Sequence, residues 1–237
     1  MVVLSWNLFH GRAMPPVNRS LYLEFASKLA QWPWDVALLQ EVPPWWPERL
    51  ADRLGVEQRT VLTSRNALLT LRRAVAERRP ELLKSNGGGC NAILARVPIA
   101  EHRAHTLRYW PERRVAQLAQ LHDGTWVVNF HASTRPARAE HELGRLWQVA
   151  LGSAGSGPLI LGGDLNLRSP RTPSAEPAIV HAVSQGVDHL FARGLSTRAP
   201  AGRPIVEADA RLVLDHRVEL GDRLVALSDH EPLLVEL

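Results

Sequence analysis

The chain has 237 residues, 45% of them hydrophobic, which is enough for one sizeable core or at most two small ones. Its net charge of +4 and pI of about 9.9 permit a polyanionic substrate, but nearly all its 28 cationic residues are arginines, a bias that a GC-rich genome also produces. One cysteine, Cys90, excludes an internal disulfide and a cysteine-cluster metal site, and no apolar run approaches the ~20 residues of a membrane span.

Apolar periodicity predicts alternating strands and helices over the first part of the chain. A strand at 2–7 is followed by a helix over 18–31, in which Leu21, Phe25 and Leu29 recur at helical spacing. Next come a strand at 36–41, a helix that ends at Gly55, an amphipathic helix over 66–84 and a loop at 85–89. Because the chain opens directly on a core strand, we find no signal peptide and expect a cytoplasmic protein.

Strands then follow in succession at 91–97, 102–109, 113–121 and 125–132, and the Asp-Gly turn at 122–124 predicts a hairpin between the last two. After them we expect a helix over 136–153, a strand at 159–166, a Pro-rich loop at 170–177, a short helix, a strand at 187–191, a loop at 199–204, and strands at 211–218 and 232–237. No linker or repeat interrupts the chain. We therefore expect a single mixed α/β domain over 1–237 with two packed sheets.

Polar residues stand where the predicted strands end: Asn7, Glu41, His131, Asp164, Asn166, Asp188, Asp229 and His230. Asp164 and Asn166 are two apart, so they share one face of their strand. Catalytic groups of sheet enzymes gather at strand ends, and oxygen ligands suit Mg²⁺. Each residue taken alone is better explained as a polar turn or a solvated loop residue.

Other chemistries lack their motifs. No G-x-S-x-G is present to indicate a nucleophilic serine. The zinc motif H-E-x-x-H is also missing, because Arg145 stands where the second histidine would follow His141. Of the three Asp-His dipeptides, we interpret 215–216 as incidental, because it lies in an Arg-flanked strand.

Taken in order, the motifs resemble the endonuclease/exonuclease/phosphatase superfamily, which includes DNase I, exonuclease III-type apurinic endonucleases, sphingomyelinases and inositol polyphosphate 5-phosphatases. They are SWN at 5–7, LLQE at 38–41, GCNAILARVPI at 89–99, NFH at 129–131, GGDLN at 162–166, VDHLF at 187–191 and SDHEPL at 228–233. The combination of GDLN with an SDH near the end of the chain is specific for this superfamily, whereas the other motifs are weak singly. The resemblance covers the whole chain and implies a four-layer α/β/β/α sandwich of two packed mixed sheets.

The resemblance also implies a Mg²⁺-dependent phosphoesterase, in which Mn²⁺ can substitute. Glu41 would be the main metal ligand, with Asn7 and Asp229 nearby. The metal would neutralise charge on the scissile phosphate. Asp164 would activate the attacking water, and Asn166 would bind the phosphate or that water.

His230 would contact a phosphate oxygen and be held by Asp188. His131 resembles the second histidine of DNase I and the phosphatases, which exonuclease III-type enzymes lack. Asn91 and Arg114 are candidate phosphate contacts, as are Arg113 and the segment 63–66, although a solvated basic face explains these arginines equally well.

The leading hypothesis is a Mg²⁺-dependent phosphodiesterase that acts as an endonuclease or exonuclease on DNA, because the chain is basic and VDHLF lacks the W-x-D-R tetrad expected in inositol 5-phosphatases. The alternative is a phosphatase or phosphodiesterase on an inositol phosphate, sphingomyelin or another small or lipid-borne ester. A non-catalytic binding protein is disfavoured, since no metal or base residue is missing. We find no exposed apolar hairpin, and expect a monomer without stable membrane insertion.

Overall fold

The structure is a computed structural model that describes residues 1–63, 66–83, 89–176, 178–195 and 214–237. Its first half contains β1 (Val2–Asn7), η1 (Phe9–Gly11), α1 (Tyr22–Gln31), β2 (Val36–Val42), α2 (Trp46–Leu54), β3 (Glu57–Leu62), α3 (Leu69–Arg78), η2 (Pro80–Leu82) and β4 (Cys90–Ala95). Its second half contains β5 (Ile99–Arg108), β6 (Arg114–Leu121), β7 (Trp126–His131), α4 (Pro136–Ala154), β8 (Leu159–Asp164), β9 (Ile179–Gln185), β10 (Asp188–Arg193), β11 (Arg217–Leu220), β12 (Arg223–Ala226) and β13 (Leu233–Glu236).

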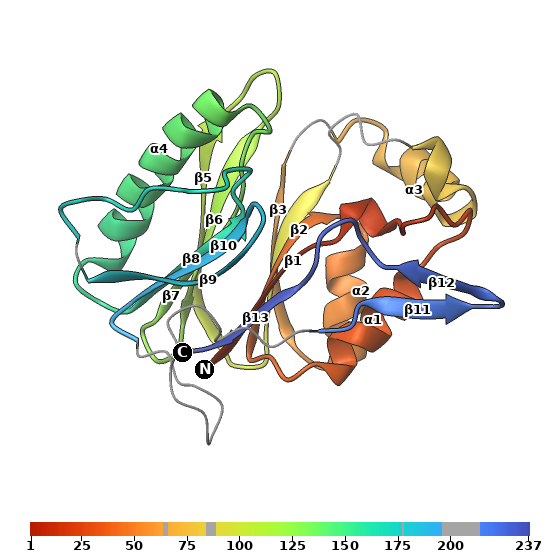
Figure 1. Ribbon diagram of the computed structural model, residues 1–237, viewed down its shortest axis with the longest axis horizontal. Coiled ribbons are helices and arrows are strands. Elements are labelled where there is room, and N and C mark those ends of the chain that lie inside the picture. Colours follow the sequence, from red (N-terminus) through yellow and green to blue (C-terminus); the bar gives the residue numbers. More distant parts are fainter. Residues whose placement is uncertain (64–65, 84–88, 177, 196–213) are drawn as a thin grey trace.

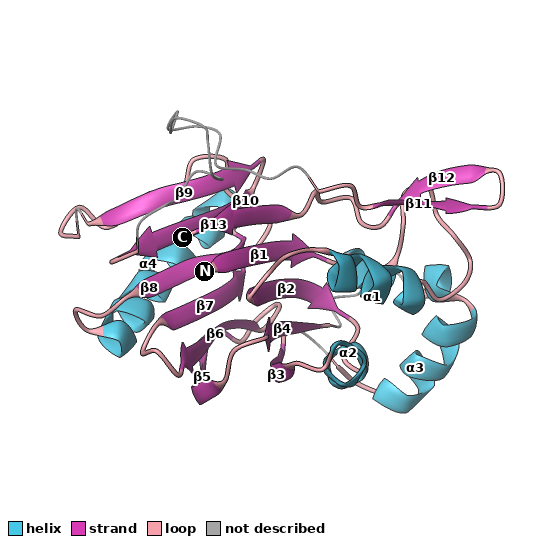
Figure 2. Ribbon diagram, turned by 90° about the horizontal axis from the view of Figure 1, so that it is seen from below, coloured by secondary structure: helices cyan, strands magenta, loops and turns pink. Residues whose placement is uncertain are grey.

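Two mixed sheets pack against each other (Figures 1 and 2). The five-stranded sheet has the order β13-β1-β2-β4-β3, and the six-stranded sheet has the order β5-β6-β7-β8-β10-β9. β1 and β2 are parallel, as are β7 and β8, while all other neighbours in the two sheets are antiparallel. The parallel pairs bring the carboxyl ends of four strands to one edge of the sandwich.

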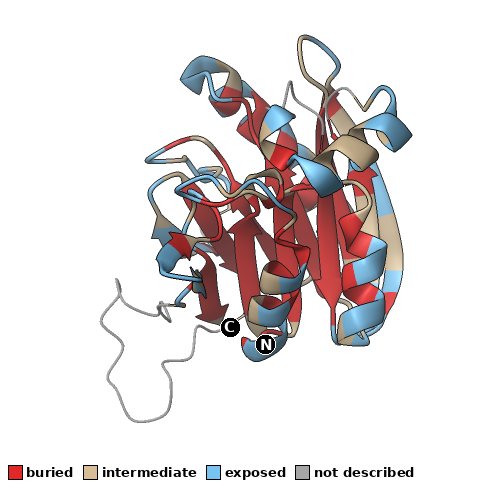
Figure 3. Ribbon diagram, turned by 90° about the vertical axis from the view of Figure 1, so that its right-hand side faces the viewer, coloured by how far each residue is buried: buried red, intermediate tan, exposed pale blue. Residues whose placement is uncertain are grey.

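Three apolar layers hold the sandwich together. Val3, Val36 and Ile160 lie in the layer between the sheets, and α1 and α2 cover the outer face of the five-stranded sheet. On the other side, α4 buries Leu146 and Ala150, because apolar residues on this helix recur at helical spacing. Figure 3 shows the buried strands between the partly exposed helices. This arrangement confirms the predicted four-layer sandwich. None of the helices in the described ranges is long and apolar enough to span a membrane.

The structure corrects several predicted elements. The short helix expected after 177 is wrong, because residues 179–185 form β9, whose β-branched Ile179 and Val183 face the core while the strand pairs with β10. β3 was not predicted, since only Val61 of this edge strand is buried. In place of the single helix expected over 66–84, the structure has the shorter helix α3 followed by the 3-10 helix η2.

Part of the predicted C-terminal region lies outside the described residues, namely the loop at 199–204 and residues 211–213 of the strand at 211–218. Of the described residues in that predicted strand, 214–216 are not in a strand, and β11 begins at Arg217. β11 forms a separate hairpin with β12, which the sequence did not predict. In Figure 1 this hairpin projects from the side of the molecule.

Candidate active site

Side chains from both sheets meet where β1, β2, β7 and β8 end. The meeting point is the Oδ2 atom of Asp164, which accepts a hydrogen bond from Asn7 Nδ2 at 3.0 Å. The same oxygen lies 3.5 Å from His131 Nε2 and 3.8 Å from His230 Nε2. Since Asn7 belongs to the five-stranded sheet and Asp164 to the six-stranded sheet, the site spans the gap between them.

The two glycines before Asp164 are needed because the chain is tightly packed at this point. A Cβ atom on Gly163, which has a φ of +132°, would lie 2.0 Å from the carbonyl oxygen of Phe130. A Cβ atom on Gly162 would lie 2.2 Å from a methyl carbon of Leu190. Only glycine fits at either position, so the GGDLN sequence brings Asp164 to the end of a close-packed strand.

Asn166 fixes the turn that follows. Its φ is 51°, a left-handed conformation that asparagine adopts more readily than most residues. Its backbone N–H donates to Asp164 Oδ1 at 3.0 Å, and its side-chain nitrogen donates to the carbonyl of Ala132 at 3.0 Å. Both oxygens of Asp164 therefore accept hydrogen bonds from the protein, which holds the carboxylate in one orientation.

The surroundings of Asp164 make it a weak acid. Burial and the nearby charge of Asp188 raise its pKa to about 7, although His230, Asn7 and the N–H of Asn166 favour the ionised form. A carboxylate with a pKa near neutrality can accept a proton from water in its catalytic step.

His230 stays protonated at neutral pH. Its Nδ1 donates to Asp188 Oδ2 at 2.7 Å, and its backbone N–H donates to Ser228 Oγ at 3.0 Å. Burial alone would lower its pKa, but the hydrogen bond and charge of Asp188, with Asp164 and Asp229, raise the pKa to about 9. A cationic imidazole thus stands beside the proposed base.

Replacing Asp188 by asparagine should shift the alkaline limb of the pH profile. In the wild type, activity that needs protonated His230 is present below a pH of about 9 and lost as the pH rises through this value. Asp188→Asn removes the charge that raises this pKa, so the limb in kcat/KM against pH should move down by at least ~1 pH unit. The matched control is Asp215→Asn, which removes the carboxylate of another Asp-His pair. If the alkaline limb of Asp188→Asn stayed at the wild-type pH, this limb would not report the deprotonation of His230.

Glu41 lies in a bulge of β2, between Leu39 and Val42, with a φ of 50°. His10 Nε2 lies 2.9 Å from Glu41 Oε2, and His131 Nε2 lies 3.8 Å from Oε1. Burial opposes ionisation of Glu41, but the hydrogen bond and charge of His10, with His131 and His230, lower its pKa to about 2. Glu41 is therefore a carboxylate at any physiological pH, as a metal ligand must be.

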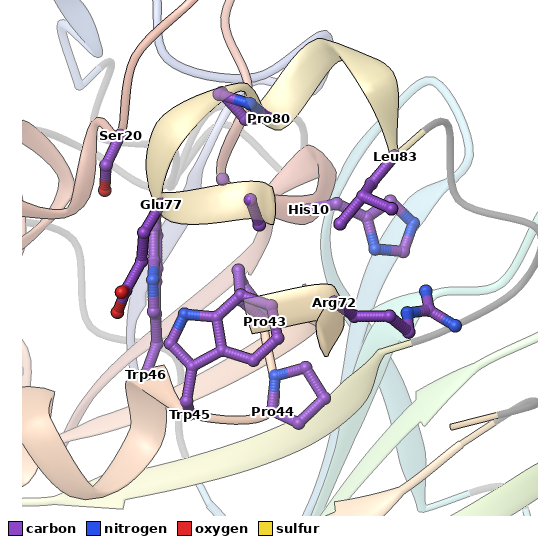
Figure 4. Close-up of a pocket in the computed structure, with 12 residues that line it drawn as sticks. His10, Ser20, Pro43, Pro44, Trp45, Trp46, Arg72, Glu77, Pro80 and Leu83 are labelled. Atoms are coloured by element: carbon purple, nitrogen blue, oxygen red, sulfur yellow. The ribbon is translucent and has the colours of Figure 1, made fainter. Parts of the chain in front are cut away.

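Sequence reasoning missed His10. Three consecutive residues, Phe9, His10 and Gly11, have positive φ values, and this sharp turn brings the histidine back onto Glu41. The available signal was a histidine three residues after Asn7, in the loop that follows the same strand. His10 also lines a pocket formed by Pro43, Pro44, Trp45 and Trp46 against α3 and η2 (Figure 4). The pocket encloses about 40 Å³, room for only a few water molecules.

A buried amide network ties the sheets together beneath the site. Gln40 Nε2 donates to Asn129 Oδ1 at 2.8 Å. Asn129 Nδ2 in turn donates to the carbonyl oxygens of Leu39 and Ala92, each at 3.0 Å. Asn129 lies on β7, and Gln40, Leu39 and Ala92 lie on β2 and β4 of the other sheet, so these bonds fix the two sheets relative to each other.

The remaining predicted residues lie in different surroundings. Asp229 has a half-exposed side chain, with Oδ1 4.0 Å from His230 Nε2. Arg114 is buried, pairs with Glu112 at 2.5 Å and donates to the carbonyl of His131 at 3.4 Å. Burial and the charge of Arg114 lower the pKa of His131 to about 3, so this imidazole is neutral at pH 7. Asn91 is fully buried, and its amide makes no hydrogen bond to any described residue.

Two groups of residues could bind a divalent metal. Glu41, Asn7 and Asp229 are the predicted ligands, and a chain of contacts through His131, Asp164 and His230, none longer than 4.0 Å, joins Glu41 to Asp229. Asp164, Asp188 and His230 form the second group, with ligand atoms within 4.8 Å of one another. In the second group His230 Nδ1 and Asp188 Oδ2 are already hydrogen-bonded to each other at 2.7 Å.

A family model described as the Endonuclease/Exonuclease/phosphatase family matches residues 4–230. The chain belongs to this family. Its members are metal-dependent phosphoesterases, so the chain is a hydrolase of phosphate esters. The match confirms the resemblance drawn from the ordered strand-end motifs. No curated protein matches the sequence significantly.

Solved structures share the family's fold with this chain. An endonuclease/exonuclease/phosphatase from Beutenbergia cavernae has 19% identity and a TM-score of 0.64, over 99% of this chain and 70% of that one. A mannosyl-6-phosphatase from Bacteroides thetaiotaomicron has 16% identity and a TM-score of 0.67, over 100% and 98%. A truncated TDP2 from Caenorhabditis elegans has 15% identity and a TM-score of 0.65, over 99% and 96%. Identities this low show the fold alone.

Proposed function

We propose that the chain hydrolyses phosphodiester bonds of nucleic acid, with DNA as the first candidate, by attack of a water molecule that Asp164 activates. The observation that supports this most is the set of contacts around Asp164 Oδ2, where one amide and two imidazoles converge on a single buried carboxylate. A carboxylate with a pKa of about 7 is suited to act as a general base near neutral pH.

Each neighbouring residue has a defined part in this proposal. Asp164 takes a proton from the attacking water while Asn7 and the N–H of Asn166 hold its carboxylate in place. Protonated His230, held by Asp188, stabilises the negative charge that builds up on the phosphate oxygens. Neutral His131 donates one hydrogen bond to the same phosphate. Asn166 contributes through its backbone N–H, which holds Asp164, while its side-chain nitrogen donates to the carbonyl of Ala132.

Residues at the ends of β1 and β2 and before β13 fit a divalent metal. Glu41 keeps its charge, Asp229 offers a solvent-accessible carboxylate, and Asn7 offers an amide oxygen, a donor set that suits Mg²⁺ and also Mn²⁺. When bound, the metal would neutralise charge on the scissile phosphate and on the leaving oxygen. His10 occupies Oε2 of Glu41 and so directs Oε1 toward the centre of the site.

Three arginines support a polyanionic substrate. Arg12 follows His10 by two residues, Arg168 follows Asn166 by two, and Arg113 precedes Arg114. Arg12 and Arg168 therefore stand close in sequence to residues of the site, and Arg113 precedes β6, whose first residue donates to the carbonyl of His131. None of the three has an acidic partner among the residues that the structure describes. Arginines placed in this way are suited to contact phosphates on either side of the scissile bond.

The proposal predicts that salt weakens cleavage of DNA. Each phosphate contact releases counterions, so log kcat/KM should fall against log salt with a slope near −0.9 per contact. Replacing Arg12, Arg113 and Arg168 by glutamine should reduce that slope by roughly 0.9 for each arginine that contacts a phosphate. The matched control replaces Arg53, Arg217 and Arg223, on α2 and the β11–β12 hairpin, and should leave the slope almost unchanged.

The same salt series separates the alternative function. The mannosyl-6-phosphatase among the similar structures is, by its name, a phosphatase rather than a nuclease. A small phosphate ester would make few ionic contacts with the protein. The protein is assayed on an inositol phosphate, a sugar phosphate, DNA and RNA across the series. If it hydrolysed either small ester at every salt concentration and cleaved neither DNA nor RNA, the nuclease proposal would be wrong and the protein would be a small-molecule phosphatase. Asp164→Asn serves as the blank for both substrates.

A further inference from the structure

Two histidines of the six-stranded sheet contact each other and the turn after β8, and the chemistry described above does not use them. His181 Nε2 lies 3.0 Å from His189 Nδ1, and His189 Nε2 lies 2.6 Å from the carbonyl oxygen of Leu167. His189 is buried, whereas His181 is exposed. Because Leu167 directly follows Asn166, this chain of contacts runs from the edge strand β9 to the turn that holds Asp164.

Neighbouring residues of β10 serve two parts of the site. Asp188 and His189 point to opposite faces of the strand, since side chains alternate along it. Asp188 accepts the hydrogen bond of His230, which precedes β13 of the other sheet. His189 lies on the same face as Phe191, whose ring packs against Trp147 of α4. One strand thus contacts His230 with one face and the turn after β8 with the other.

A bulge in β9 determines the direction of His181. Phe191 pairs with His181, but its neighbour Leu190 pairs with Val183, which leaves Ala182 outside the register. The extra residue puts Val183 in the layer between the sheets and His181 on the outer face, where its ring stacks on Phe191 with the centroids 4.5 Å apart. Without the bulge, side chains two apart would share one face, and the two histidines would not meet.

The partners of His189 determine where its proton lies. A carbonyl oxygen can only accept, so Nε2 of His189 carries the proton that it donates to Leu167. Burial lowers the pKa of His189 to about 4, so at neutral pH its Nδ1 has no proton and accepts a hydrogen bond from His181 Nε2. Both nitrogens of the buried imidazole therefore have partners, which holds the ring in one orientation.

The turn is held to β10 on both sides of Asn166. Before Asn166, the backbone N–H of Leu165 donates to the carbonyl of Val187 at 3.0 Å. After Asn166, the carbonyl of Leu167 accepts the hydrogen bond of His189. The second of these contacts is the one that depends on a side chain, so it is the one that a substitution can remove.

We propose that His189, with His181 as the donor to its second nitrogen, is a positioning residue for the reaction. It holds the turn in which the N–H of Asn166 donates to Asp164 Oδ1, and so keeps this carboxylate in the orientation that activates water. The inference rests on the role proposed for Asp164, and it adds a residue that supports this role from outside the site.

The test compares His189→Leu, which loses the donor, with His189→Gln, whose side-chain nitrogen can lie close to the position of Nε2. Rates are measured on whichever ester of the salt series the wild type hydrolyses fastest, at a temperature at which circular dichroism shows every variant to be folded. His189→Leu should lower kcat by about tenfold or more and change KM little, because a displacement of ~1 Å in a positioned group can cost ~10²-fold. His189→Gln should recover most of the rate.

Two further variants complete the comparison. His181→Phe keeps a ring against Phe191 and removes the donor at an exposed position, so the protein should fold normally and lose kcat by a smaller factor of about three. His105→Leu removes an exposed histidine of β5 in the same sheet. It is the matched control and should change neither kcat nor KM.

A double variant separates positioning from a contribution to stability alone. If His189 acts through Asp164, adding His189→Leu to Asp164→Asn should lower the residual rate by less than about threefold, because the base is already absent. The full loss of rate in that background would overturn the proposal, as would a wild-type kcat in both His189→Leu and His181→Phe. Either result would leave the role of Asp164 standing, because Asp164→Asn alone tests it. Since the substrate is chosen from the salt series, failure of the nuclease proposal does not affect this comparison.

Discussion

The variant Asp164→Asn is expected to lower kcat on a phosphodiester by at least the ~10²–10⁴-fold that general-base removal produces. Asparagine has nearly the same shape and keeps one of the two acceptor oxygens, so it can accept from either Asn7 or the N–H of Asn166, and the strand end should stay folded. What disappears is the group that takes the proton from water. Initial rates at saturating Mg²⁺, with circular dichroism to check folding, measure the effect.

A pH profile distinguishes loss of the base from local damage. Wild-type kcat/KM should fall as the pH drops below about 7, because Asp164 then becomes protonated and inactive as a base. Residual activity of Asp164→Asn should lack this acidic limb. Asp222→Asn, in the turn of the β11–β12 hairpin, is the matched control and should retain both rate and profile. Near-normal turnover in Asp164→Asn would move the role of base to another residue.

Removal of divalent metal is the second large effect. We expect EDTA to abolish hydrolysis and Mg²⁺ or Mn²⁺ to restore it. Glu41→Gln should weaken metal binding strongly, because it replaces a carboxylate that stays ionised down to a pH of about 2 by a neutral amide. Isothermal titration with Mn²⁺ measures this affinity independently of turnover. Full activity of Glu41→Gln in EDTA would contradict a metal mechanism altogether.

His10 supplies a graded comparison for the same titration. Its contact with Glu41 Oε2 at 2.9 Å orients the carboxylate, and loss of such an outer contact typically costs ~10–100-fold in metal affinity. His10→Ala should show that loss. His10→Gln keeps a donor on the side chain and should recover part of the affinity. If the two variants had the same affinity as the wild type, the His10–Glu41 contact would have no part in metal binding.

The strand-end residues could be predicted because each follows an apolar run in the chain. Asn7, Glu41 and Asp164 end buried strands, and the order of their motifs indicated both the fold and the family. A strand end is a local property, so periodicity and turn residues are enough to locate it. That these ends converge on Asp164 was implied by the resemblance rather than by the spacing.

Features that depend on tertiary contacts could not be predicted in the same way. His10 contacts Glu41 only because three residues in succession adopt positive φ, which a Phe-His-Gly sequence does not signal. β9 forms a strand because β10 offers it a partner, whereas its sequence alone was compatible with a short helix. Tyr109 and Trp110, between β5 and β6, are exposed because of where the fold places this loop, which the local sequence does not indicate.

The amide network around Asn129 has a consequence for how such an enzyme can change its substrate. Because Asn129 binds two carbonyl oxygens of the opposite sheet, the distance between Asp164 and Glu41 is set inside the sandwich. The loop between β5 and β6 lies outside that framework. Its length and composition can therefore diverge, altering what the enzyme selects, while the chemistry that it performs stays intact.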